Sequence, residues 1–110
     1  MAKEYEIKSL GDQKRRIISI EGKVYFENEK EFVGEIEKMW NKFSSTTEEI
    51  YLDMRKTTYL NSSGISEIVR LHNKHFEKYR SPLTLVANQW LKSKMKLSKL
   101  DKVINVVESI

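Results

Sequence analysis

Residues 50–65 read Ile50-Tyr51-Leu52-Asp53-Met54-Arg55-Lys56-Thr57-Thr58-Tyr59-Leu60-Asn61-Ser62-Ser63-Gly64-Ile65. Apolar side chains occupy every second one of the first five positions, which predicts a β-strand over 50–54. From Ile65 to Phe76 apolar side chains recur every three or four residues, which predicts a helix over about 63–79. The tetrad 61–64 therefore stands between the end of a strand and the start of a helix.

The serines of this tetrad have two interpretations. The first amides of a helix have no intrahelical acceptor, and together with the helix dipole they favour an added phosphate. Ser and Asn are also common helix caps, each worth ~1 kcal/mol, and a cap implies no function. Asn61, Ser62 and Ser63 offer more caps than one helix needs, and Gly64 leaves room for an approaching kinase or phosphatase. The residues alone favour capping and a phosphorylation switch about equally.

The rest of the chain alternates strands and helices. A short edge strand over 5–9 and a strand over 15–20 form an antiparallel hairpin through a turn at 11–13, and Gly22 ends the pattern. Further strands are predicted over 83–87, buried on both faces, and over 103–107. Strands that are separated by helices indicate parallel pairing. We predict one α/β domain over 1–110, with a mixed, mostly parallel sheet of about five strands.

Two more helices have recognisable starts. Asn28 and Glu31 form a capping-box-like pair before an apolar stripe that runs from Phe32 to Phe43. Asn88 is a predicted cap for a short helix that carries Trp90, Leu91 and Met95. We interpret the stripe as core and not as a cofactor site.

Composition excludes several classes of protein. The chain has 110 residues, 39% of them hydrophobic, and no cysteine, which excludes disulfides, thiolate catalysis and cysteine-ligated zinc. The first residues lack the apolar stretch of a secretory signal. No apolar run approaches the ~18 residues of a membrane span. We expect a cytoplasmic protein without a membrane span.

The charge of the chain is unevenly distributed. Residues 1–55 carry ten Lys/Arg against twelve Asp/Glu, whereas residues 56–110 carry ten against four. Lysines at 92, 94, 96, 99 and 102 supply half of the basic residues in the second group. A nucleic-acid site is one interpretation, but only Trp90 interleaves with these lysines, so we favour a solvated helix face and expect no nucleic-acid partner.

The chain shows little catalytic chemistry. His72 and His75 have a spacing that can hold a metal, but a third ligand is not apparent nearby, and we interpret His72 as a buried residue with one satisfied nitrogen. Ser63, His72 and Asp53 are the residue types of a hydrolase triad without the G-x-S-x-G elbow. A glycine-rich phosphate loop is also lacking. We expect no enzyme activity, metal or cofactor.

A resemblance to a known family favours the switch. The order of elements, the segments 50–54 and 58–65, and the later segment 97–103 resemble a STAS domain, the family that includes the bacterial anti-sigma-factor antagonists. The resemblance covers roughly residues 15–108. It implies a mixed sheet with helices largely on one side and a regulatory role without catalysis.

In such antagonists a serine directly before the glycine is phosphorylated by a partner that is both anti-sigma factor and serine kinase. By resemblance this residue is Ser63, with Ser62 as second choice, and Asn61 and Gly64 shape the loop. The unphosphorylated protein would bind the anti-sigma factor, and a PP2C-type phosphatase would reset the switch. Asn61 and Tyr25 stand where the family usually has aspartates, which reduces the negative charge around Ser63.

The expected partner surface comprises residues on both sides of the tetrad: Lys56, Thr57, Thr58, Ile65, Ser66 and Glu67. Two alternatives stay open. The protein could be a constitutive scaffold, such as the accessory subunit of a lipid-transport ATPase, whose serines only cap the helix. Less in keeping with the sequence is a basic nucleic-acid-binding module that uses the C-terminal lysines.

Overall fold

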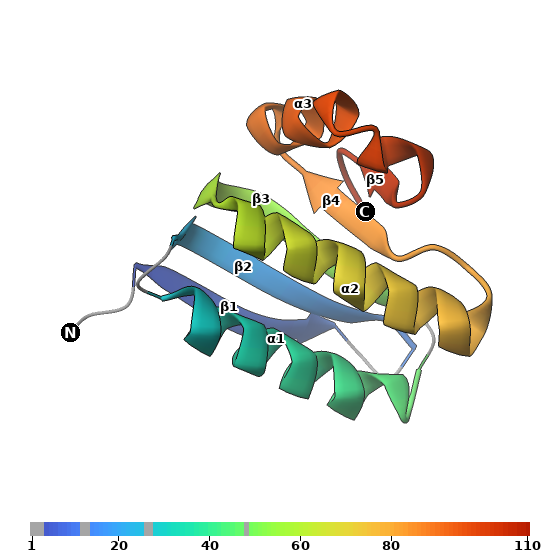
Figure 1. Ribbon diagram of the computed structural model, residues 1–110. Helices are drawn as coiled ribbons and strands as arrows, with labels where there is room; N and C mark the ends of the chain where they lie inside the picture. Colours follow the sequence, from blue (N-terminus) through green and yellow to red (C-terminus); the bar gives the residue numbers. More distant parts are fainter. Residues whose placement is uncertain (1–3, 12–13, 26–27, 48) are drawn as a thin grey trace.

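A five-stranded sheet runs through the molecule in the order β1-β2-β3-β4-β5 (Figure 1). The computed structural model describes residues 4–11, 14–25, 28–47 and 49–110. The strands are β1 (Tyr5–Gly11), β2 (Arg16–Val24), β3 (Ile50–Leu60), β4 (Thr84–Ala87) and β5 (Asn105–Val107). The helices are α1 (Glu29–Ser44), α2 (Ser62–Tyr79), α3 (Gln89–Leu97) and the short 3-10 helix η1 (Leu100–Lys102).

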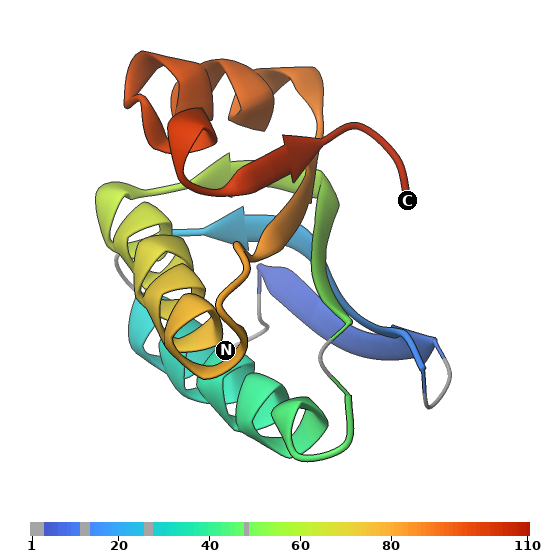
Figure 2. The ribbon, with the colours of Figure 1, turned by 90° about the vertical axis from the view of Figure 1, so that its right-hand side faces the viewer.

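The predicted α/β architecture is confirmed. β1 pairs with β2 antiparallel, and every later pair in the sheet is parallel. The helices α1 and α2 lie side by side on one face of the sheet, while α3 lies next to its β4–β5 end (Figures 1 and 2). Residues 12 and 13 of the predicted hairpin turn lie outside the described residues.

The core lies between the sheet and these two helices. Phe32 and Ile36 on α1 are fully buried, and Trp40 and Phe43 nearly so, which confirms that the apolar stripe is core. Fully burying a side chain of this size stabilises the fold by about 1.5–3 kcal/mol. The same hydrophobic cluster includes residues of the sheet and of α2: Ile18, Ile20, Leu52, Met54, Leu85, Ile68 and Leu71.

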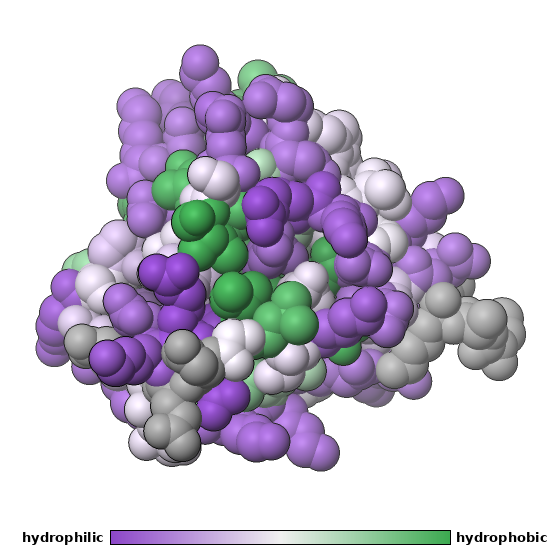
Figure 3. Space-filling model, turned by 180° about the vertical axis from the view of Figure 1, so that it is seen from behind, coloured by the Kyte–Doolittle hydropathy of each residue, from purple (hydrophilic) through white to green (hydrophobic). Residues whose placement is uncertain are grey.

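The opposite face of the sheet is not covered by α1 or α2. Hydrophobic side chains lie in the middle of this face, surrounded by hydrophilic ones (Figure 3). Leu10, at the β1 edge, is exposed over 48% of its surface, and Lys56 on β3 forms an ion pair with Glu21 on β2 at 3.4 Å. This face is therefore mixed in character, in contrast with the apolar face beneath the helices.

Gly22 does not end β2 as predicted. The strand continues to Val24, and Gly22 adopts a φ of +102° within it, a conformation that favours glycine. The pairing of β2 with β3 shifts on both sides of Gly22, as it does at a bulge. A Cβ atom at this position would overlap the backbone carbonyl of Glu4.

Of the two helix caps predicted at Asn88 and Asn28, the first is confirmed and the second is wrong. Asn88 caps α3 as predicted, because its side chain accepts from the N–H of Leu91 at 2.9 Å. The capping box predicted at Asn28 and Glu31 is wrong. The Asn28 amide instead closes the preceding turn: it accepts from the N–H of Tyr25 at 3.0 Å and donates to the carbonyl of Lys23 at 3.1 Å.

β3 is longer than predicted, since it continues past Met54 to Leu60. Its buried residues alternate up to Met54 and then recur every third position, at Thr57 and Leu60. The pairing explains the change, because β2 residue Ser19 faces Asp53 whereas Glu21 faces Lys56. An extra residue in β3 at this point changes which side chains face the core.

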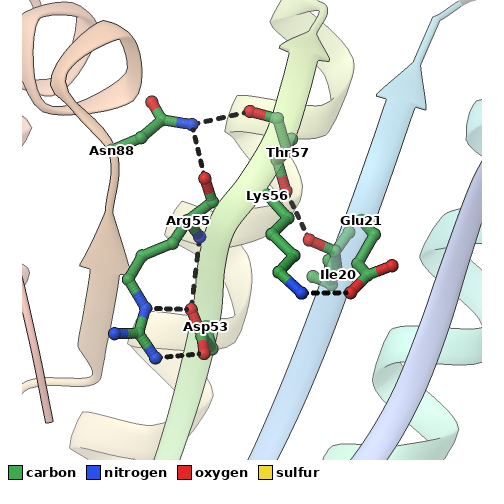
Figure 4. A network of polar contacts seen from close by, with 7 residues as sticks. All are labelled: Ile20, Glu21, Asp53, Arg55, Lys56, Thr57 and Asn88. Carbon is green, nitrogen blue, oxygen red and sulfur yellow. Dashed lines mark hydrogen bonds and ion pairs between the residues drawn. The ribbon is translucent and has the colours of Figure 1, made fainter.

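Asn88 supports the second half of β3 (Figure 4). β4 pairs with β3 only as far as Met54, so the later carbonyls of β3 need other donors on that side. The Asn88 side-chain nitrogen donates to the carbonyls of Arg55 at 3.1 Å and Thr57 at 2.8 Å. Asn88 therefore supplies hydrogen bonds to carbonyls of the strand that leads to the tetrad, and it also caps α3.

The two glycines Gly22 and Gly34 should respond in opposite ways to the same substitution. Gly34 lies exposed in α1, and a Cβ atom there would meet nothing within 4 Å, so Gly34→Ala should stabilise the protein by ~0.5–1 kcal/mol. Gly22→Ala should destabilise it by about 1–3 kcal/mol because of its backbone conformation. Urea unfolding of both variants measures the difference, and equal effects would contradict the role assigned to Gly22.

Candidate functional site

The junction between β3 and α2 is held by Asn61. Its backbone N–H donates to the carbonyl of Val24 at 3.0 Å, which fixes the residue to the end of β2. Its side-chain oxygen accepts from the N–H of Gly64 at 2.8 Å, and its carbonyl accepts from the N–H of Ile65 at 3.0 Å. Asn61 is therefore the N-cap of α2, which begins at Ser62.

This geometry frees the serines from the capping role. Ser62 and Ser63 are the first two residues of α2, and both are exposed. The first amides of a helix have no intrahelical acceptor, and the positive end of the helix dipole lies beside them. A phosphate on either hydroxyl would therefore sit in a favourable electric field.

Position 64 requires glycine for a structural reason that the sequence did not reveal. The residue is buried, and a Cβ atom there would overlap the side chain of Leu60, which is itself fully buried. Gly64 thus lets the first turn of α2 approach the end of β3. The packing against Leu60, and not room for an incoming enzyme, requires glycine here.

The residues of the expected partner surface fall into two groups. Lys56, Thr58 and Ser66 are exposed, and Ile65 is half-buried. Thr57 is fully buried and donates to the carbonyl of Ile20 at 2.8 Å. Glu67 is only 3% exposed. Thr57 and Glu67 therefore do not belong to an exposed surface, because the bulge in β3 and the packing of α2 turn them inward.

A groove beside the serines was not foreseen from the sequence. It has a volume of about 400 Å³ and lies between α2 and the segment that joins α3 to η1. Its lining residues are Ser62, Ile65, Ser66, Val69, Ser98 and Leu100. The resemblance of segment 97–103 to the family was the available signal, but only the fold shows that this segment lies beside the tetrad.

Exposed aromatic surface adjoins the junction as well. Tyr59, the penultimate residue of β3, is 43% exposed, and its ring lies 6.2 Å from the ring of Trp90 on α3. The sequence indicated no contact between Trp90 and the tetrad. An exposed tyrosine near an expected contact surface is a common anchor of protein interfaces.

The histidines are both engaged in the core. Nδ1 of His72 accepts from the backbone N–H of Leu83 at 3.2 Å, as expected for a buried histidine with one satisfied nitrogen. Nδ1 of His75 accepts from the indole N–H of Trp40 at 3.3 Å, and burial lowers the pKa of His75 to about 4. Within the described ranges no group of three or more His, Cys, Asp or Glu residues could hold a metal ion.

The residue types of a hydrolase triad are not assembled. His72 directs Nδ1 to Leu83, and Asp53 is held in a fork by Arg55, with contacts of 3.0 and 2.8 Å (Figure 4). The hydrogen bond from Arg55 lowers the pKa of Asp53. Ser63 lies at the start of α2, nine residues before His72 on the same helix, far beyond hydrogen-bond reach.

Part of the C-terminal basic charge is already compensated. Lys92 pairs with Glu108, and the Lys94 ammonium lies 5.2 Å from the centre of the Trp90 ring. These contacts agree with a solvated helix face better than with a surface shaped for a polyanion. In the part of the chain that the structure describes, no helix is long and apolar enough to cross a membrane.

The family comparison and one solved structure agree with this architecture. The family model for the STAS domain matches residues 6–110. An anti-sigma factor antagonist from Mycobacterium paratuberculosis is similar in structure, with a TM-score of 0.77 and 14% identity over 96% of this chain and 87% of that one. A STAS-domain antisigma-factor antagonist from Rhodobacter sphaeroides gives a TM-score of 0.49 and 10% identity over 94% and 86%. No curated protein matches the sequence.

Fold and site together define an α/β domain, with two helices on one sheet face and an exposed serine pair at the start of the second helix. Because the family model covers nearly the whole sequence, the chain belongs to the STAS domain family. Domains of this fold are generally without enzymatic activity.

The capping role of Asn61 can be tested by substitution. Asn61→Ala removes the acceptor for the Gly64 N–H and should destabilise the protein by ~1 kcal/mol, whereas Asn61→Asp keeps an acceptor and should retain the stability. Asn73→Ala, at an exposed position inside α2, is the matched control. Thermal and urea unfolding report the values. A loss no larger in Asn61→Ala than in Asn73→Ala would show that Asn61 is not the cap.

Proposed function

We propose that this protein is an anti-sigma-factor antagonist that is controlled by phosphorylation of Ser63. One observation supports the proposal above all others: Asn61 caps α2, so the adjacent serines are exposed without being needed for the helix start. This removes the main argument for a purely structural role of the serines. The membership in the STAS family and the structural likeness to an anti-sigma factor antagonist agree with the proposal.

The proposed switch follows from the charge of a phosphate. Phosphorylation adds about −1.5 to −2 charges, which the start of α2 tolerates while it faces water. Inside a fitted interface the same group loses its hydration and requires new partners. A difference of ~3 kcal/mol in binding free energy changes the affinity more than a hundredfold. Ser63 is the proposed site and Ser62 the second choice.

The partner surface is proposed on both sides of the serines. It includes Lys56, Thr58, Ile65 and Ser66, and the neighbouring groove extends it toward Leu100. The groove supplies apolar surface that a partner side chain can fill, and the exposed hydroxyls at its end provide the polar rim of an interface. A phosphate on Ser62 would stand at the mouth of this groove, because Ser62 lines it, and a phosphate on Ser63 would lie at the next position of the same helix turn.

In the proposed circuit the unphosphorylated protein binds an anti-sigma factor that is also a serine kinase, and thereby releases the sigma factor. The kinase phosphorylates Ser63 and dissociates, and a PP2C-type phosphatase restores the binding form. The protein acts in the cytoplasm as a regulator of transcription. Its binding requires neither metal nor cofactor.

Substitution of Ser63 tests the switch. Ser63→Asp should weaken binding to the kinase-type anti-sigma factor of the same genome by tenfold or more, because a carboxylate supplies part of the charge of a phosphate. Ser63→Ala should bind as the wild type does, and Ser93→Asp, at an exposed position of α3, is the matched control for added charge. Isothermal titration calorimetry measures the affinities.

Equal affinities of wild type, Ser63→Asp and Ser63→Ala would contradict the proposal. Together with co-purification of an ATPase and unmodified serines, that result would favour a constitutive accessory subunit. Salt-dependent binding to nucleic acid would instead point to the C-terminal lysines.

A further inference from the structure

Glu67 is a buried carboxyl group that the proposed switch does not use. It lies in the second turn of α2 and is 3% exposed. Its Oε1 atom is fully buried and has no hydrogen-bond partner among the described residues. A buried polar atom without a partner costs free energy, and a buried unpaired charge costs much more. The fold therefore holds this carboxyl in a site that disfavours its ionised form.

The charged neighbours of Glu67 do not compensate it. Glu37 on α1 faces it, and the nearby cations form ion pairs with Glu37 instead: Arg70 at 3.3 Å and Lys74 at 3.9 Å. Burial, and secondly the charge of Glu37, raise the pKa of Glu67 to about 7, against the smaller opposing effects of Arg70 and Lys74. The carboxyl thus changes its charge near neutral pH and not in the acidic range.

Glu67 also lies one helical turn below Ser63. Residues four positions apart on a helix are neighbours, with about 5–6 Å between their Cβ atoms. Ser63 is exposed at the helix start and Glu67 is buried beneath it. A phosphate on Ser63 would therefore be a close like charge for an ionised Glu67.

We infer that Glu67 makes the phosphorylated state of Ser63 sensitive to pH: the neutral carboxyl tolerates a phosphate one turn away, and the ionised carboxyl opposes it. This inference rests on the proposed function, since it assigns a regulator to the same serine. It requires no movement of a domain. It requires only that the phosphate and the carboxyl lie one helical turn apart on α2.

The effect is reciprocal. If a phosphate on Ser63 favours the neutral form of Glu67, then protonation of Glu67 favours the phosphorylated protein by the same free energy. Below neutral pH Glu67 is protonated and adds no charge beside the phosphate. As the pH rises through neutrality the carboxyl ionises, and the phosphorylated protein should lose stability relative to the unmodified one.

The test uses full-length protein with phosphoserine installed at position 63 by genetic encoding. Carbon-13 NMR of the glutamate carboxyl groups follows Glu67 from pH 4 to 9 in the phosphorylated and unmodified proteins. The midpoint of Glu67 should lie near neutrality in the unmodified protein and rise by about one unit or more with phosphate present. Phosphoserine at 93, an exposed position of α3, should leave Glu67 unchanged.

A midpoint of Glu67 in the ordinary range of glutamate, or the same midpoint with and without phosphate, overturns the inference. Melting temperatures provide a second readout. The difference between unmodified and phosphorylated protein should widen more from pH 6 to pH 8 in the wild type than in Glu67→Gln, where only the phosphate itself titrates. Because the phosphate is installed and not supplied by a kinase, the result is independent of whether Ser63→Asp weakens partner binding.

Discussion

The contact between the end of β3 and the first turn of α2 is the constraint on which the site depends. Leu60 is buried as the last residue of the strand, and Gly64 packs against it without a side chain of its own. Asn61 joins the same point to β2 and caps the helix. Two positions remain between the cap and the glycine, and both of their side chains face water. The exposure of Ser62 and Ser63 is therefore a consequence of packing beneath them.

Much of the architecture follows from periodicity, because the apolar stripe of α1 and the alternation of β3 at 50–54 have the spacing of the surfaces they bury. Sequence reasoning failed where a local signal served another purpose. Gly22 permits a bulge within β2 and does not end it, and the Asn28 amide is taken up by the preceding turn. The polar residues after Met54 do not show a strand pattern, so the rest of β3 could not be predicted. Two of its carbonyls accept hydrogen bonds from Asn88, a residue more than thirty positions away.

At the candidate site, the sequence identified the serines and most of their exposed neighbours, but it did not show how deeply each residue is buried. Thr57 and Glu67 are polar and were expected on the surface, yet the bulge and the helix packing turn them inward. Thr57 is satisfied by a backbone carbonyl, whereas Glu67 keeps an unpartnered oxygen. A groove built from α2 and the segment before η1 requires contacts between distant parts of the chain, so only the fold shows it.

The most direct measurement is an intact-mass and phosphosite map of the protein from its native cells, in growth and under stress. A phosphate on Ser63 whose occupancy changes between these conditions is the expected result, because an exposed hydroxyl at a separately capped helix start is available to a kinase. Protein that is unmodified in every condition would contradict the switch. It would leave the fold intact and favour a scaffold that binds its partner constitutively.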